Sequence, residues 1–263
     1  MSLKNFLFKI GRLLSKVVKS SDLENFLGRF RDNYISVDLI RVGGNSDGGY
    51  LVPNILNKIT HCFSPGVDIT SNFESYLSKY YGIKSFMADA SVLKTSIKDD
   101  NFIFIKKFIG NRTDSDFVTL KEWLHTSLDR DENNLLLQMD IEGSEYEVLT
   151  VESDEILKRF SIMVIEFHNL QNMFDKNFLN MFTSIFEKIY RNFSICHVHP
   201  NNCCGTVSHN GVTVPKVIEV TFVRNDCLDE IKIDKPVTLP HKLDYKNLVN
   251  IDDINMPVKW WKN

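Results

Sequence analysis

From Lys58 onward, the chain alternates between short apolar runs and amphipathic helical stretches. Several runs are apolar throughout, as expected for strands whose two faces are both covered by helices. Strands that alternate with helices form right-handed βαβ units and a parallel, doubly wound sheet. The expected strands are His61–Ser64, Lys84–Asp89, Phe102–Lys106, Leu135–Asp140, Ile162–Phe167, Phe193–His199 and Val217–Val223, with helices expected at Asn72–Tyr80, Thr119–Leu128, Glu145–Glu152 and Asn177–Tyr190.

The last two expected strands differ from the others because no helical pattern separates them. The stretch between them contains Asn210-Gly211, a dipeptide typical of a hairpin turn. We therefore expect the final strand to insert antiparallel to its neighbours. Seven mostly parallel strands with one late antiparallel strand are the outline of the methyltransferase variant of the Rossmann architecture, an α/β fold.

Composition narrows the classes of protein that fit this pattern. A chain of 263 residues is long enough for one large α/β domain. With 31 Lys and Arg against 34 Asp and Glu, the net charge is −3, which argues against a nucleic-acid partner. The apolar runs are far shorter than the roughly 20 residues of a membrane span. The five cysteines include adjacent Cys203 and Cys204 and do not resemble a secreted disulfide framework, so we expect a cytoplasmic protein.

The N-terminal region predicts two helices in succession. Apolar residues from Leu3 to Val18 recur at helical spacing with basic residues between them, and Ser20-Ser21-Asp22 is a candidate N-cap for a second helix. The basic first helix either covers the core, pairs with a second copy in a homo-oligomer, or makes weak contact with an anionic membrane surface. We therefore expect a helical extension (residues 1–35), a main domain (36–225) and a tail packed on that domain (226–263).

Ligands of open α/β sheets bind beyond the carboxyl ends of the strands, so the residues at those ends are candidates for a site. The first strand ends in Ser64-Pro65-Gly66-Val67-Asp68, without the G-x-G-x-x-G pattern of dinucleotide-binding proteins. Asp89 ends the second strand, 23 residues beyond Gly66, where an acid can accept hydrogen bonds from ribose hydroxyls. With Glu74 on the intervening helix, this pattern favours an adenosine-type ligand.

Acids and histidines follow the later strands. The fourth runs into Asp140-Ile141-Glu142-Gly143-Ser144-Glu145, where Glu145 is expected to stabilise a helix N-terminus and Asp140 needs a partner. Glu166 and His168 share one face of the fifth strand, and His199 ends the sixth. We predict a shared active site in which either a histidine acts as general base or Asp140, Glu166 and His168 hold Mg²⁺ or Mn²⁺.

Several motifs resemble the FkbM-type family of S-adenosylmethionine-dependent methyltransferases, in order from Arg41 to Arg224. The Asp-x-Glu-Gly-x-Glu element at Asp140–Glu145 is the most diagnostic of them. The commonest Gly-x-Gly loop of the family is replaced by Ser-Pro-Gly-Val-Asp. The other matching segments are Arg41-Val42-Gly43, Asp47-Gly48-Gly49-Tyr50, Phe73-Glu74, Ile165-Glu166-Phe167-His168, His199-Pro200-Asn201-Asn202 and Val217-Ile218-Glu219-Val220-Thr221.

The resemblance implies O-methylation of a sugar or sugar-nucleotide hydroxyl, in surface-polysaccharide or secondary-metabolite synthesis. It implies that Asp89 binds the ribose of S-adenosylmethionine, that Asp116 reaches the adenine, and that the remaining cofactor contacts come from Ser64, Gly66, Asp68, Glu74 and Tyr50. The catalytic residues would be His168, Asp140 and His199. Two alternatives remain open: a non-catalytic docking module that uses the N-terminal helix and Trp260-Trp261, and a nicotinamide-dependent sugar oxidoreductase.

Overall fold

The computed structural model describes residues 6–7, 15–67, 71–93, 97–129, 132–233 and 235–262. Its centre is a seven-stranded sheet in the order β10-β13-β9-β8-β3-β4-β5. β13 alone is antiparallel to its neighbours, and the other pairs are parallel. The predicted α/β methyltransferase-type sheet is therefore confirmed. Its strands are β3 (His61–Pro65), β4 (Lys84–Ala88), β5 (Phe102–Ile105), β8 (Leu135–Met139), β9 (Phe160–Phe167), β10 (Phe193–Pro200) and β13 (Ile218–Arg224).

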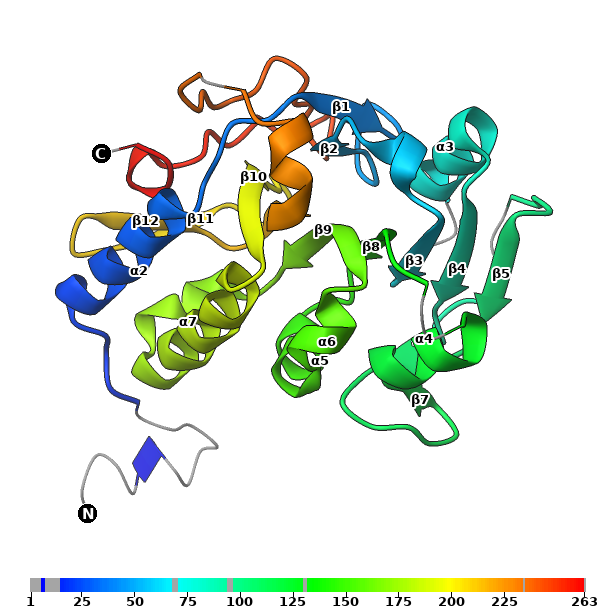
Figure 1. Cartoon of the computed structure of the whole chain (residues 1–263). Coiled ribbons are helices and arrows are strands. Elements are labelled where there is room, and N and C mark those ends of the chain that lie inside the picture. The colour runs from blue at the N-terminus through cyan, green and yellow to red at the C-terminus, as the bar shows by residue number, and fades with distance from the viewer. Residues whose placement is uncertain are drawn as a thin grey trace.

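Structural layers cover both faces of this sheet (Figure 1). One face carries most of the helices and the other carries α3 together with a small hairpin of β1 (Leu39–Val42) and β2 (Tyr50–Pro53). All residues of β8 and β9 are buried, which explains their unbroken apolar pattern. The helices are α3 (Asn72–Tyr81), α4 (Leu120–Ser127), α5 (Glu145–Val151), α6 (Asp154–Leu157) and α7 (Lys176–Tyr190).

The Asn210-Gly211 turn is present, but it joins a separate hairpin. Both residues have positive φ, and they connect β11 (Thr206–His209) to β12 (Val212–Pro215), as expected for a two-residue turn. β13 then returns to insert between β10 and β9. The expected antiparallel strand is therefore confirmed, while the turn belongs to this hairpin. The remaining short elements are β6 (Phe108–Ile109), β7 (Phe117–Val118), η1 (Leu56–Lys58), η2 (Leu170–Phe174) and η3 (Asn225–Glu230).

The second N-terminal helix forms as α2 (Ser20–Asp32), and its N-cap is Lys19, one residue before the predicted Ser20-Ser21-Asp22 cap. Its apolar face is buried, and the rings of Phe26 and Phe30 meet Trp260 of η4 (Val258–Trp260) edge-on. The predicted first helix lies largely outside the described residues. Residues 15–19 are not helical, in contrast to that prediction. No described helix has the length and apolar character needed to cross a membrane.

Candidate functional site

A glycine turn brings the carboxyl ends of β3 and β8 into contact. Gly66 has φ +83°, and a Cβ at this position would lie 1.5 Å from the Asp140 carbonyl oxygen. The Asp140 N–H donates to the Pro65 carbonyl oxygen at 3.2 Å. Only glycine combines this backbone conformation with so close an approach, so the turn fixes Asp140 beside the end of β3.

Beyond this turn lies a cavity of about 540 Å³, a size typical of small-molecule sites. Asp89 lies at its wall, and its Oδ1 accepts hydrogen bonds from the Ser91 backbone N–H (2.7 Å) and hydroxyl (2.6 Å). Within the described residues its second carboxylate oxygen accepts no hydrogen bond. The full lining combines acids with apolar rings: Asp47, Gly66, Ala88, Asp89, Ser91, Phe108, Ile109, Phe117, Asp140, Ile141, Glu142 and Ser144.

Of two other residues expected at the cofactor, Asp116 lies elsewhere and Asp68 is not described. Asp116 is exposed and is not among the described residues that line the cavity, although its neighbour Phe117 is. The Asp116 backbone carbonyl accepts a hydrogen bond from the Phe108 N–H at 2.9 Å, so Asp116 helps to position an aromatic wall. Asp68 falls outside the described residues.

Ser64, Glu74 and Tyr50 belong to a buried polar chain next to the cavity. The Ser64 hydroxyl contacts both Glu74 Oε1 and Gln138 Oε1, and Gln138 Nε2 donates to the Tyr50 hydroxyl at 3.4 Å. Burial raises the pKa of the Glu74 carboxyl, although the hydrogen bond to Ser64 opposes the shift. A hydroxyl has one proton to donate, so a protonated Glu74 completes the chain. Glu74, Gln138 and Tyr50 also line a smaller space of about 90 Å³ together with Gly66 and Asp140.

His168 stands at the centre of an acidic cluster. Its Nδ1 lies 3.0 Å from Glu145 Oε1 and donates to it, because a carboxylate only accepts. Its Nε2 lies 3.7 Å from Asp140 Oδ1, 3.6 Å from Glu166 Oε1 and 3.6 Å from Glu142 Oε2. The Tyr146 hydroxyl donates to the His168 carbonyl oxygen, so both ends of the residue are held.

Glu145 is the residue that orients this imidazole. It is fully buried, and its Oε1 also accepts from the backbone N–H groups of Ile141 (3.2 Å) and Gly143 (3.1 Å). The local sequence predicts only that Glu145 stabilises a helix N-terminus. Its contact with His168, 23 residues later, adds a role that no local pattern indicates.

The cluster shifts the pKa values of its members. Burial raises the pKa of Asp140 to about 7, with Glu142 adding to the shift and His168 opposing it. Burial and the charges of Asp140 and Glu219 raise the pKa of Glu166. Burial alone would lower the pKa of His168, but the hydrogen bond and the charge of Glu145 raise it. A nearby cation would stabilise the ionised form of these buried acids.

Within the described residues, three carboxylate oxygens of the cluster are buried without a hydrogen-bond partner: Asp140 Oδ1, Glu145 Oε2 and Glu166 Oε2. Ligand atoms of Asp140, Glu166 and His168 all lie within 4.8 Å of one another. Carboxylate oxygens with an imidazole suit Mg²⁺ or Mn²⁺. The donor set and its unpartnered oxygens therefore fit a divalent cation.

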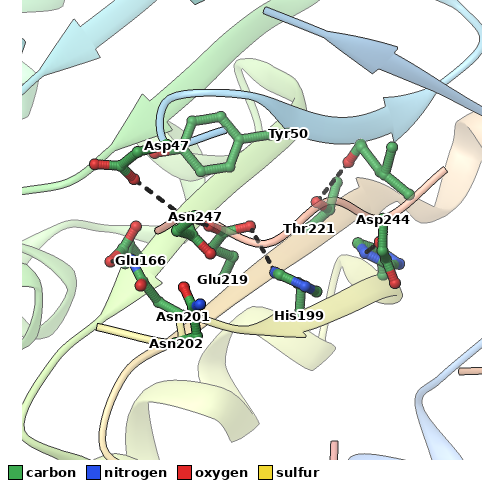
Figure 2. Close-up of polar contacts among 12 residues, drawn as sticks. Asp47, Tyr50, Glu166, His199, Asn201, Asn202, Glu219, Thr221, Asp244 and Asn247 are labelled. Atoms are coloured by element: carbon green, nitrogen blue, oxygen red, sulfur yellow. Dashed lines mark hydrogen bonds and ion pairs between the residues drawn. The ribbon is translucent and has the colours of Figure 1, made fainter. Parts of the chain in front are cut away.

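His199 lies in a second cluster, separated from Glu166 by one strand. Across the sheet, Glu166 of β9 pairs with Glu219 of β13, which pairs with His199 of β10. His199 Nδ1 lies 3.6 Å from Glu219 Oε2, and Asn247 Nδ2 donates to Glu219 Oε1 at 2.6 Å. Figure 2 shows Asn247 between Glu219 and Asp47, whose Oδ1 accepts from the same amide at 3.2 Å.

The chain segment 241–253 covers this second cluster. The Asn202 amide donates to the carbonyl oxygens of Leu248 (3.0 Å) and Ile251 (3.2 Å). Asp244 of the segment lies 2.9 Å from His197 Nε2. These contacts place His199 under a polar cover and not at the wall of the large cavity.

Several residues at the two clusters were not singled out from the sequence as functional. Asn201 Nδ2 donates to Glu166 Oε1 at 2.9 Å, and Glu219 and Asn247 complete the second cluster. Phe108 and Phe117 form the aromatic wall of the large cavity. Asn201 and Glu219 do lie in segments of the motif resemblance, which was the available signal for them. Nothing in the pattern of the sequence distinguishes Asn247.

A mostly parallel sheet with one antiparallel strand, and acids gathered at the carboxyl ends of its strands, define a methyltransferase-type Rossmann domain. The model of the methyltransferase FkbM domain matches residues 29–193. The chain belongs to this methyltransferase family. Membership implies S-adenosylmethionine as the methyl donor. The match ends before β13 and the 241–253 segment.

Solved structures with related folds are distant in sequence. A chain of a fibrillarin/Nop5p complex has 12% identity and a TM-score of 0.38, over 64% of this chain and 73% of that chain. A precorrin-6y C5,15-methyltransferase from Geobacter metallireducens GS-15 has 10% identity and a TM-score of 0.35, over 80% and 93%. A putative rRNA methylase from Clostridium thermocellum has 8% identity and a TM-score of 0.35, over 65% and 90%. No curated protein matches the sequence.

Proposed function

We propose that the protein is an S-adenosylmethionine-dependent O-methyltransferase that acts on a sugar hydroxyl. The observation that carries the proposal is the meeting of Asp140, Glu166 and His168 beside the large cavity, with buried carboxylate oxygens that have no partner. Membership of a methyltransferase family favours this function over a docking module or a nicotinamide-dependent oxidoreductase.

The large cavity offers what a nucleoside needs. Its aromatic wall of Phe108 and Phe117 suits a base, and the unpaired oxygen of Asp89 suits ribose hydroxyls. Phe108 and Phe117 replace the exposed Asp116 as candidates for the adenine contact. The Gly66 turn leaves backbone accessible at the cavity wall. S-adenosylmethionine, when bound, supplies an already activated methyl group, so the chain needs to align the acceptor and remove its proton.

His168 is the candidate base. Its Nδ1 is committed to Glu145, so Nε2 is the nitrogen that can take a proton from an acceptor hydroxyl, and it faces Asp140 and Glu166. Because the pKa of His168 is raised, methyl transfer is expected to increase with pH as this imidazole loses its proton. Asp140 would keep the imidazole in place and stabilise its charged form.

A divalent cation is the second version of the same centre. Asp140, Glu166 and His168 would hold Mg²⁺ or Mn²⁺, which both orients and acidifies a hydroxyl. Chelation should then abolish turnover, and added Mg²⁺ or Mn²⁺ should restore it. With His168 as a free base, chelation should leave turnover unchanged. Full activity in chelator from an active His168→Ala enzyme would contradict both versions.

The charged side chains that line the two cavities indicate which class of acceptor can bind. Among the described residues that line them there are Asp47, Asp89, Asp140, Glu142 and Glu74 but no Lys or Arg. The phosphates of a nucleoside diphosphate are commonly bound by Arg and Lys side chains. An uncharged sugar is therefore a better acceptor candidate than a sugar nucleotide, and the pathway would be surface-polysaccharide or secondary-metabolite synthesis.

The donor half of the proposal is tested by calorimetric titration with S-adenosylhomocysteine. Asp89→Ala should weaken binding by about 1.5–3 kcal/mol, since it removes hydrogen bonds to a charged group. Asp116→Ala is the matched control and should change affinity by less than about threefold. Unchanged binding in a folded Asp89→Ala protein would remove Asp89 from the site. A scan of sugars with radiolabelled S-adenosylmethionine then tests the acceptor half.

A further inference from the structure

The two edge strands of the sheet, β10 and β5, differ in whether another segment pairs with their outer side. At one end, residues 33–35 run beside β10: the Ile35 N–H donates to the Ile195 carbonyl oxygen, and the Ile195 N–H donates to Asn33, both at 2.8 Å. At the other end, β4 is the one strand that pairs with β5 within the described residues. Figure 1 shows β5 at the outer limit of the sheet. An uncovered strand edge is a template for pairing with another chain.

The hydrogen bonds between β4 and β5 show which backbone N–H and C=O groups of β5 point away from β4. The carbonyl oxygens of Asn101 and Ile105 accept hydrogen bonds from the backbone N–H groups of Ser85 and Asp89. The backbone groups of the odd-numbered residues of β5 therefore point toward β4. Because strand backbones alternate, Phe102 and Phe104 direct their groups outward. The Phe102 N–H is held by the Asp99 carbonyl oxygen at 3.0 Å. In the part of the chain that the structure describes, the Phe104 N–H and the Phe102 carbonyl form no hydrogen bond, so they can pair with a partner strand.

The sequence across this edge is complementary to itself. Reading from residue 99, it is Asp-Asp-Asn-Phe-Ile-Phe-Ile-Lys-Lys. Antiparallel pairing with a second copy, centred on Ile103, places Asp100 opposite Lys106 and Phe102 opposite Phe104. Asp100 and Lys106 are both exposed, and neither forms an ion pair within the described residues. Shifting the register by two residues would set Phe102 or Phe104 opposite a charge, so the pattern selects one register.

We propose that the chain forms a two-fold dimer through antiparallel pairing of β5 with β5 of a second copy. The two sheets then become one continuous sheet, and the two-fold axis passes between the two Ile103 residues. Each Phe104 N–H donates to the Phe102 carbonyl of the other copy. Cross-strand aromatic and charge pairs stabilise the register. Ile103, which is 36% exposed in the single chain, is covered by its own counterpart.

Charge reversal tests this interface on the full chain. Light scattering after size exclusion should give wild type twice the mass of the 30.4 kDa chain. Asp100→Lys and Lys106→Asp should each raise the dimer Kd at least about tenfold, and the double variant should restore it to within about threefold of wild type. Lys235→Asp, at an exposed position outside the sheet, should leave the mass unchanged. A monomeric wild type, or a dimer that ignores the single reversals, would overturn the proposal.

Cysteine crosslinking tests the register. In a Cys203→Ser/Cys204→Ser background, Ile103→Cys places two thiols opposite each other at a non-hydrogen-bonded pair, within the Cα separation of a disulfide. Mild oxidation should give a crosslinked dimer. Val151→Cys, at an exposed position on α5, should stay uncrosslinked. Crosslinking of the control alone, or of neither variant, would contradict pairing centred on Ile103.

Discussion

His168 and His199 lie at the carboxyl ends of β9 and β10, two strands separated by β13, and their surroundings differ. His168 has Asp140 and Glu142 beside it, and both acids line the large cavity. His199 pairs with Glu219 under the 241–253 segment, where Asn247 satisfies the acid. The first cluster has carboxylate oxygens left free, while the acid of the second is already engaged. The contacts around each histidine therefore distinguish the two strand ends. We propose that the first cluster takes part in the reaction and that the second stabilises the structure.

The largest expected difference between the two clusters is in their affinity for a divalent cation. In the cation version of the centre, Mn²⁺ titration followed by electron paramagnetic resonance should show a site in wild type. Asp140→Asn should weaken it at least about 100-fold, since loss of a ligand costs no less than loss of an outer-shell partner. Glu219→Gln should keep wild-type affinity, because Glu219 is already paired with His199 and Asn247. Loss of binding only in Glu219→Gln would reverse the comparison.

The polar cover of the second cluster should contribute stability. Asn247→Ala removes the donor to Glu219 Oε1 and to Asp47 Oδ1 and leaves a buried acid less satisfied. We expect the free energy of unfolding to fall by about 1–3 kcal/mol. Asn250→Ala, at an exposed position in the same segment, should change it by less than about 0.5 kcal/mol. Urea unfolding measures both, and equal effects would show that the cover is not held through Asn247.

The smallest effect concerns Glu74, whose buried carboxyl has a raised pKa. The folded state binds this proton more tightly than the unfolded state, so its stabilisation is complete below about pH 4.3 and is lost as pH rises through the folded-state pKa. Across that window stability should fall by about 1.4 kcal/mol per pH unit. Glu74→Gln should remove this slope. An identical pH profile for the variant would mean that Glu74 is not the group responsible.

The sheet could be predicted from the sequence because its strands are buried on both faces and read as unbroken apolar runs. Gly66, Asp89 and Asp140 could be predicted for a related reason, since strand ends follow from strands. Glu145 could not be assigned fully, because an acid in the first turn of a helix has a sufficient local explanation. Its bond to His168 depends on how two strand ends meet in space.

The second cluster was beyond prediction from the sequence for a different reason. Glu219 faces His199 only because β13 inserts between β9 and β10 in one register. Asn247 lies in a segment without periodicity, and its partners are 28 and 200 residues away. Side-chain amides that bind backbone carbonyls, as Asn202 does, leave no pattern in the chain that would identify them.

We propose that the acceptor loses its proton at the first cluster and not at the second. Single-turnover methyl transfer from S-adenosylmethionine to an acceptor found in the sugar scan tests it, with His168→Ala and His199→Ala compared at saturating donor. We predict that His168→Ala slows transfer by about 10²–10⁴, with S-adenosylhomocysteine affinity unchanged, and that a folded His199→Ala protein stays within about threefold of wild type. A fast His168→Ala enzyme beside a slow His199→Ala enzyme would contradict the account.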